Sequence, residues 1–144
     1  MKIKKLDELQ LIKRGNVFKN CLFVLIGLLF LNIVMLESGM VFIDQRSAMV
    51  LMILSIVVLL SVQMIYYEIY PLSEKRQRAV YAVAGLFGLA AVVFSAVIMA
   101  TGEAAFVENA MLSEIGSIMI MGGLFLTIPI AYFIRRVYNK RASE

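Results

Sequence analysis

Four long apolar runs, separated by short polar or charged segments, dominate the pattern of hydrophobic and polar positions along the chain. They cover residues 17–36, 48–67, 79–100 and 115–134. Each is close to the roughly 20 residues that an α-helix needs to cross the hydrocarbon core of a bilayer. None alternates like a strand, and helices satisfy their own backbone hydrogen bonds in lipid. The pattern therefore predicts an all-α membrane protein, a bundle of four transmembrane helices in up-down order.

The segment before the first run, residues 1–15, has a helical pattern of its own. Apolar side chains recur in it at every third position, at Ile3, Leu6, Leu9 and Ile12. Lysines and acidic residues fill the other faces, and Gly15 marks the predicted end. The pattern predicts a short amphipathic helix on the cytoplasmic surface, held by its apolar stripe and by anionic lipid. A flexible basic tail is the alternative.

The connections between the runs are short, and we expect a single membrane domain, residues 1–144. The middle connection, from Pro71 to Arg78, is too short to fold on its own, and so are the two connections on the other side. Short connections favour antiparallel neighbours, so we expect consecutive helices to pack against each other. Residues 135–144 are predicted to form a basic cytoplasmic tail.

The distribution of basic residues predicts the orientation. Thirteen of the 14 lysines and arginines flank the side that holds both termini and the middle connection, whereas Arg46 lies on the other side. The positive-inside rule places both termini in the cytoplasm. All 6 tyrosines lie near the same side, as in an interfacial aromatic belt. With 62% hydrophobic and 17% charged residues, the composition also favours a multi-pass protein of a cell membrane over a soluble domain.

The residue types that are missing exclude several kinds of chemistry. The chain has no histidine, which excludes histidine-bound zinc, bis-histidine haem and a histidine general base. Its single cysteine, Cys21, excludes an intramolecular disulfide and is read as a small packing residue. No charged residue lies in the middle of a run, which argues against an ion-coupled transporter. We therefore predict a protein that is not an enzyme, with no catalytic residue, cofactor, metal or nucleic-acid partner.

Small residues mark the helix contacts that the sequence predicts, because helices in lipid associate by close packing. The third run has four of them on one helical face: Ala84, Gly88, Ala91 and Ser95. The fourth run has another four in helical register: Gly116, Gly123, Thr127 and Ala131. We expect these two runs to pack closely together. A homodimer formed through one of the stripes is the alternative.

Pro129 lies inside the fourth run and predicts a kink in that helix. A proline has no N–H group, so the carbonyl of Phe125 loses its usual donor. We expect Thr127 to help satisfy the freed groups. A static kink is favoured over a moving hinge, because proline is frequent in membrane helices.

The polar residues within the runs suggest a possible polar site between helices. They are Asn32, Ser55 and Gln63. The favoured interpretation is ordinary hydrogen bonding between helices. At the end of the second run, Glu68 is expected to form an exposed ion pair with Lys75 or Arg76.

Methionines gather toward the side with few basic residues. The pairs Met49 and Met52, and Met119 and Met121, have spacings that suit thioether binding of Cu(I). On a helix, however, Met119 and Met121 do not share a face. Methionine is also a common filler of membrane cores, and packing is the favoured interpretation.

Two short motifs precede the first run: Asp7-Glu8-Leu9-Gln10 and Ile12-Lys13-Arg14-Gly15. With residues 68–77 of the middle connection, they resemble small multi-span membrane proteins of unknown function, known mainly from Gram-positive bacteria. Those proteins open with an Asp-Glu-Arg-Gln-like start and a basic pair. Leu9 departs from that pattern, in which arginine is usual. The resemblance implies a family with no established activity.

Three hypotheses about function are compatible with these patterns. The leading one is a non-enzymatic accessory protein that contacts another membrane protein or a second copy of itself within the lipid bilayer. The second is a small transporter or channel for a hydrophobic solute or an antimicrobial peptide. The third is an immunity-type protein that shields the cell from a membrane-active toxin.

Overall fold

The computed structural model describes residues 8–39, 41–69, 74–108 and 111–142, and it is mostly helical. Its four long helices are α1 (Glu8–Glu37), α2 (Gln45–Tyr66), α3 (Glu74–Thr101) and α4 (Glu114–Ala142). All four are long and apolar enough to cross a membrane. The predicted all-α architecture with four candidate spans is confirmed.

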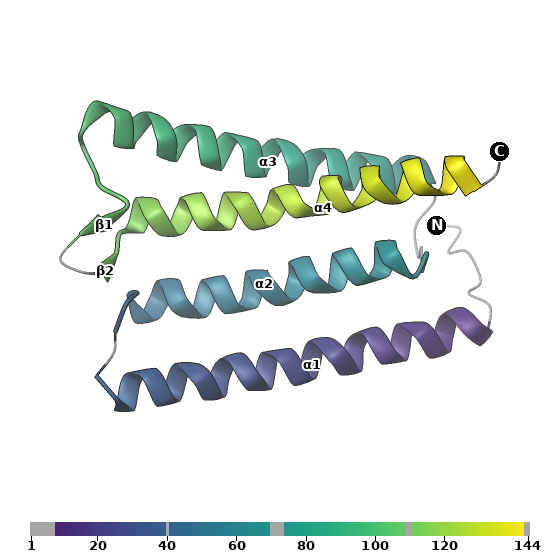
Figure 1. Cartoon of the computed structure of the whole chain (residues 1–144), viewed down its shortest axis with the longest axis horizontal. Helices are drawn as coiled ribbons and strands as arrows, with labels where there is room; N and C mark the ends of the chain where they lie inside the picture. Colours follow the sequence, from purple (N-terminus) through teal and green to yellow (C-terminus); the bar gives the residue numbers. More distant parts are fainter. Residues whose placement is uncertain (1–7, 40, 70–73, 109–110, 143–144) are drawn as a thin grey trace.

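The two ends of the helices differ in character. At one end lie the starts of α1 and α3 and the ends of α2 and α4, as Figure 1 shows on its right-hand side. Most of the arginines and lysines lie there, and we call it the basic end. The opposite end carries a small antiparallel ribbon of two strands, β1 (Val107–Glu108) and β2 (Met111–Leu112), and we call it the hairpin end.

The ribbon ties together two connections that are far apart in the sequence. The N–H of Leu112 donates to the carbonyl of Phe42 at 2.7 Å, and Ile43 and Leu112 form an isolated parallel bridge. The connection between α1 and α2 is therefore hydrogen-bonded to the connection between α3 and α4. Nothing in the sequence pattern indicates this contact.

Side-chain caps set the starts of α2 and α4 at the hairpin end. The carboxylate of Asp44 accepts from the backbone N–H groups of Arg46 and Ser47, at 3.1 and 3.2 Å. The hydroxyl oxygen of Ser113 accepts from the N–H of Gly116 at 3.0 Å. Each cap satisfies backbone donors that have no partner within the helix, which fixes where the helix begins.

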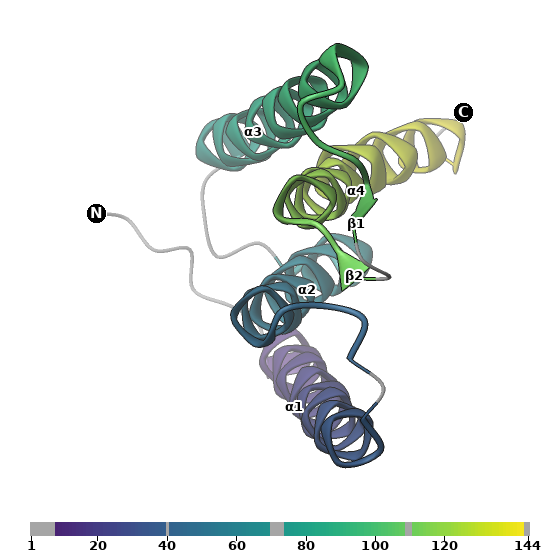
Figure 2. The same cartoon turned by 90° about the vertical axis from the view of Figure 1, so that its left-hand side faces the viewer.

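The helices lie side by side in the order α1, α2, α4, α3, as the view along the helices in Figure 2 shows. The extensive contacts join α1 to α2, α2 to α4, and α4 to α3. The expectation that consecutive helices are neighbours is therefore wrong for α2 and α3, because α4 lies between them. As a result α2 and α4 run parallel, while α1–α2 and α3–α4 are antiparallel.

Two predicted boundaries also need correction. The helix does not stop at Gly15, because α1 continues from Glu8 through the first apolar run. A single glycine costs a helix only about 1 kcal/mol, which the flanking residues offset. Residues 1–7 of the predicted amphipathic helix lie outside the described residues. At the other terminus, α4 extends to Ala142, so residues 135–142 are helical where a tail was predicted.

Two small clusters of buried apolar side chains join the helices. The first joins α1 to the end of α2 and contains Val17, Cys21 and Ile69. The second joins α2 to α4 and contains Val58, Ile65 and Ile128. Most other large apolar side chains face outward, as expected of helices whose outer surface is covered by lipid.

Candidate functional site

An unusual backbone conformation ends α2 at the basic end. Glu68 has a φ of 57°, in the left-handed region. Its N–H donates to the carbonyl of Ile65 at 3.2 Å, and the N–H of Ile69 donates to the carbonyl of Met64 at 3.0 Å. This pair of bonds defines a Schellman motif, whose left-handed position is usually a glycine. A residue with a Cβ atom costs roughly 1–2 kcal/mol there, so the side chain of Glu68 must find compensating contacts.

Side chains of α4 supply those contacts. Asn139 Nδ2 and Arg135 Nη2 both donate to Glu68 Oε1, at 2.6 and 3.1 Å. Arg135 and Asn139 are four residues apart, so they share one face of α4. The hydrogen bond from Asn139 lowers the pKa of the Glu68 carboxyl from its ordinary value; desolvation opposes the shift, and the positive charges of Arg135 and Lys13 add to it. The ionised carboxylate of Glu68 thus links α2 to α4.

The expected partner of Glu68 was Lys75 or Arg76, which follow it closely in the chain. The structure shows an ion pair from Glu68 to Arg135, 67 residues away. The physical reason is the order of the helices: α4, not α3, is the neighbour of α2 at this point. The side chain of Lys75 lies outside the described residues, so its pairing with Glu68 stays a prediction.

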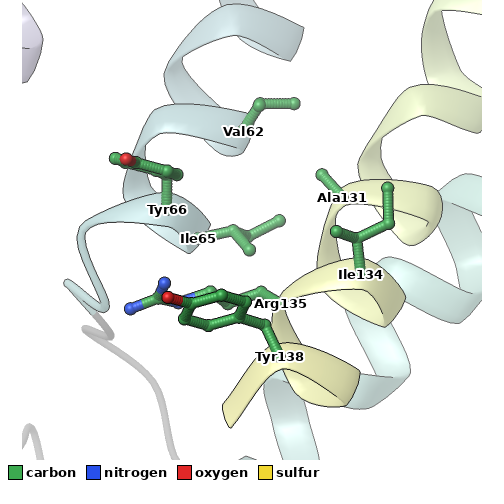
Figure 3. Close-up of a pocket in the computed structure, with 7 residues that line it drawn as sticks. All are labelled: Val62, Ile65, Tyr66, Ala131, Ile134, Arg135 and Tyr138. Atoms are coloured by element: carbon green, nitrogen blue, oxygen red, sulfur yellow. The ribbon is translucent and has the colours of Figure 1, made fainter. Parts of the chain in front are cut away.

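A cleft of about 450 Å³ opens beside this ion pair, between α2 and α4. Figure 3 shows apolar side chains from the two helices facing each other across it, with Arg135 and the ring of Tyr138 along one edge. The lining residues are Val62, Ile65 and Tyr66 of α2, and Ala131, Ile134, Arg135 and Tyr138 of α4. The cleft is therefore apolar on its walls and cationic at its basic end.

Arg135 is the charged group of the cleft, and two tyrosine rings flank it. Its guanidinium carbon lies 5.8 Å from the ring centre of Tyr66 and 5.7 Å from that of Tyr138. Such cation–π contacts orient the guanidinium and hold it where it is only 28% exposed. The Nε atom is buried and has no hydrogen-bond partner. An unpaired buried N–H costs about 1–3 kcal/mol, so the position of Arg135 must be stabilised by its other contacts.

A second, shallower cleft of about 270 Å³ lies next to the first on α4. Its lining residues are Phe133, Ile134, Val137, Tyr138 and Arg141. Ile134 and Tyr138 line both clefts, so they form a ridge between them. Each cleft has an arginine among its lining residues.

Two of the three polar residues predicted to form a site, Ser55 and Gln63, lie apart on α2. Asn32 is partly buried on the face of α1 toward α2. The hydroxyl of Ser55 donates to the carbonyl of Leu51 in its own helix, at 2.7 Å. Gln63 is eight residues farther along α2, about 12 Å by helical rise. Its Oε1 atom is buried without a partner, so Ser55 and Gln63 do not share one polar site.

The small residues of α3 do lie against α4. Ala84, Gly88, Ala91 and Ser95 share the buried or half-buried face of α3, and Ser95 is fully buried. A Cβ atom on Gly88 would lie 2.7 Å from the carbonyl oxygen of Gly122. A Cβ atom on Gly122 would lie 2.8 Å from the carbonyl oxygen of Gly88. The two backbones therefore touch at a reciprocal glycine contact.

On α4 the prediction selected the wrong glycine of an adjacent pair. A Cβ atom on Gly123 would have nothing within 4 Å, whereas Gly122 faces α3. Successive helical residues point about 100° apart, so only one of the two can face α3. Thr127 is on the exposed side with Gly123, and its hydroxyl donates to the carbonyl of Leu124 at 2.6 Å. That carbonyl precedes the one of Phe125 that Pro129 was expected to free.

The other two small residues of α4 have different neighbours from those predicted. A Cβ atom on Gly116 would lie 2.5 Å from the carbonyl oxygen of Phe106. The absence of a side chain at Gly116 therefore lets the connection between α3 and α4 pack closely against α4. Ala131 packs on the cluster between α2 and α4 and lines the larger cleft. The contact of α3 with α4 also includes Gly85, where a Cβ atom would lie 3.1 Å from Cγ of Pro129. The helix α4 continues through Pro129, and the kink stays a prediction.

The methionines of the two candidate copper pairs differ in exposure. Met49 is exposed, and Met52, Met119 and Met121 are half-buried, so binding of Cu(I) by these pairs stays a hypothesis. Over the described residues, no group of three or more cysteine, aspartate or glutamate side chains could hold a metal ion.

Sequence reasoning missed the cleft and the roles of Arg135, Tyr138 and Asn139. The available signal was the spacing of Arg135 and Asn139, which puts a cation and an amide on one helical face just after the fourth run. Comparison with known proteins adds no further assignment, because no family model, curated protein or solved structure matches the chain.

Proposed function

We propose that the chain is a non-enzymatic accessory protein of a bacterial cell membrane, which acts by binding another membrane protein along α1. The supporting observation is the position of α1 at the edge of an open row. Among the described helices, α1 has extensive contact with α2 alone. Its buried or half-buried positions in the apolar run form one line: Val17, Cys21, Leu25, Leu28 and Asn32.

The remaining surface of α1 is large and apolar. Phe23 and Phe30 are 63% and 67% exposed, and they are seven residues apart, so they lie on one face. In lipid, apolar exposure alone drives no association, but close packing against a partner does. Bulky aromatic side chains on one face offer a surface into which a partner helix can pack.

The outer helix α3 is less suited to binding a partner, because its packing against α4 cannot rearrange easily. The reciprocal contact of Gly88 with Gly122 fixes α3 against α4 at backbone level. The contact of α1 with α2 consists of side chains, which can change rotamer at modest cost. An approaching helix can therefore be accommodated more easily beside α1.

The proposal includes an orientation with the basic end in the cytoplasm. It rests on the charge rule, because the basic end carries the arginines and lysines of both termini and of the middle connection. An alkaline phosphatase fused after Glu144 should be inactive, whereas an impermeant thiol reagent should label a cysteine at Ser38 in a Cys21→Ala background. An active Glu144 fusion with a protected Ser38 position would reverse the orientation.

Crosslinking inside the membrane tests the partner proposal. A photoreactive residue in place of Phe30 should give a crosslink to one defined protein, identified by mass spectrometry. The same residue in place of Phe87 on α3, which is 64% exposed, is the matched control and should give lipid adducts. The Phe30 crosslink should weaken when Phe23 is changed to Ala.

Three outcomes would count against the proposal. Lipid adducts alone at Phe30 would leave α1 without a protein partner. A crosslink only to a second copy of the chain would make the protein a homodimer and not an accessory of another. Substrate-dependent flux in proteoliposomes would favour the transporter hypothesis instead.

A further inference from the structure

We propose that the basic end of α4 binds one anionic phospholipid, with an acyl chain in the cleft between α2 and α4 and the headgroup phosphate on Arg135. The site does not depend on the partner proposed for α1, because α2 and α4 alone provide the larger cleft. Three features of the cleft support it: the shape of its walls, the charge at its mouth, and the place of both along the helices.

The walls fit a hydrocarbon chain. Val62 and Ile65 of α2 face Ala131 and Ile134 of α4 across the larger cleft, as Figure 3 shows. The volume of about 450 Å³ lies in the range of pockets that hold small amphipathic ligands. The smaller cleft continues beyond the ridge formed by Ile134 and Tyr138. Two grooves on either side of one ridge match the two chains of a diacyl lipid.

The charge at the mouth fits a phosphate. Glu68 accepts from Nη2 of Arg135, and the Arg135 side chain stays 28% exposed beside the cleft, so its charge remains accessible to a headgroup. Arg141, among the lining residues of the smaller cleft, is exposed. Lys13 and these two arginines outnumber the single carboxylate of Glu68, so a bound anion gains attraction. Guanidinium groups also bind phosphate oxygens by paired hydrogen bonds, which makes arginine well suited to this headgroup.

The place of these groups along the helices favours a lipid over a soluble anion. Along α4, the apolar residue Ala131 precedes Arg135, Tyr138 and Arg141, so the cationic and aromatic groups lie nearer the basic end. A lipid in the bilayer has the same order, with its chains inside and its phosphate at the interface. Basic pockets between membrane helices bind acidic headgroups in this way. The tyrosine rings are also at the level where aromatic residues meet headgroups.

Native mass spectrometry of the purified full chain tests the charge. The measured quantity is the fraction of protein that retains one lipid, with phosphatidylglycerol compared with phosphatidylcholine of the same acyl chains. The wild-type chain should prefer phosphatidylglycerol by about fivefold or more, the effect of one cation near an anionic headgroup. Arg135→Gln should remove most of that preference. Arg136→Gln, an equal charge change at an exposed neighbour, should retain it.

A second variant tests the cleft while leaving all charges and the Glu68 ion pair intact. Ile134 is 62% exposed, so Ile134→Trp fills the cleft without disturbing a buried core. Binding of phosphatidylglycerol should fall by about fivefold or more, with the helical circular dichroism unchanged. Glycerol phosphate, added as a soluble headgroup, should not displace the lipid, because it cannot occupy the apolar walls.

The following results would overturn the proposal. Equal binding of the two lipids by the wild-type chain would show that no anion site exists. An equal loss in Arg136→Gln and Arg135→Gln would indicate diffuse surface charge. Unchanged binding by Ile134→Trp would exclude the cleft as the site of the chain. Displacement by glycerol phosphate would make the ligand a soluble phosphate.

Discussion

Glycines lie in the interface of α3 with α4, whereas the glycines of α1 lie outside its interface with α2. Gly88 and Gly122 bring the backbones of α3 and α4 into contact. The glycines in α1, Gly15 and Gly27, would have nothing within 4 Å of a Cβ atom, and α1 contacts α2 through larger side chains such as Val17. A glycine therefore signals close approach only when it lies on the contact face.

The difference has an energetic meaning in a membrane. Lipid does not push apolar helices together, so the strength of an interface depends on how many atoms meet at close range. In the contact of α3 with α4 the backbones themselves touch, so no side-chain rearrangement can loosen it without moving the helices apart. The contact of α1 with α2 joins flexible side chains around a few buried residues. We therefore expect α3 and α4 to form the stable pair and α1 to separate first.

The largest expected effect comes from breaking the tight interface. Gly122→Ala places a methyl group 2.8 Å from the carbonyl oxygen of Gly88 and 2.9 Å from Cγ2 of Val92. The helices must move apart, which should lower the free energy of unfolding by up to about 3 kcal/mol. Gly123→Ala is the matched control one residue away, with nothing within 4 Å, and should cost nothing. Reversible unfolding in mixed detergent micelles measures both; equal losses would refute the assignment of the contact to Gly122.

A smaller loss should follow from weakening the looser interface. Ile69 is 1% exposed in the cluster that joins α1 to the end of α2. Ile69→Ala removes that side chain and should cost about 2 kcal/mol, at the low end for buried isoleucines, because side chains nearby can relax. Hydrogen exchange should increase in α1 and stay unchanged in α3 and α4. Increased exchange in all four helices would show that the two interfaces are not independent.

The hairpin end offers a third test, of whether the tight interface depends on the connection beside it. Gly116→Ala directs a methyl group at the carbonyl oxygen of Phe106 and at Leu112, within 2.9 Å. The connection can shift more easily than a helix, so the expected cost is about 1–2 kcal/mol. Proteolysis near Phe106 should become faster, while the stability of the α3–α4 pair should change less than in Gly122→Ala. A greater loss of that stability than in Gly122→Ala would contradict this ranking.

The smallest effect is expected at the link between α2 and α4, through pH. Folding lowers the pKa of Glu68, so its interactions contribute fully at pH values above the ordinary carboxyl pKa. That contribution is lost as the pH falls through the lowered pKa of the folded protein. Because the side chain of Glu68 is 43% exposed, the expected loss is below about 1 kcal/mol. Glu68→Gln should flatten this part of the pH dependence of unfolding, and an unchanged profile would assign it to other carboxyls.

The number of helices and the contact face of α3 could be predicted because they depend on local pattern. Twenty-residue apolar runs define spans, and Gly88 with its small neighbours defines a face. The order of the helices in space could not be predicted, since it depends on contacts between distant segments that no local sequence pattern indicates. That order decided the partner of Glu68. The choice between Gly122 and Gly123 depends on the rotation of α4 about its axis. The sequence alone does not indicate that rotation, because either glycine could face α3.

Because Cys21 is buried, its reactivity with thiol reagents reports how often α1 separates from α2. Cys21 is 3% exposed between α1 and α2, and it is the single cysteine in the chain. A thiol reagent can react only while α1 is away from α2, so the labelling rate equals the opening frequency multiplied by the chance of capture. At saturating reagent the rate becomes the opening rate itself. Binding of a partner to α1 would then change the labelling rate of Cys21, and this can be measured in the natural sequence without an engineered probe.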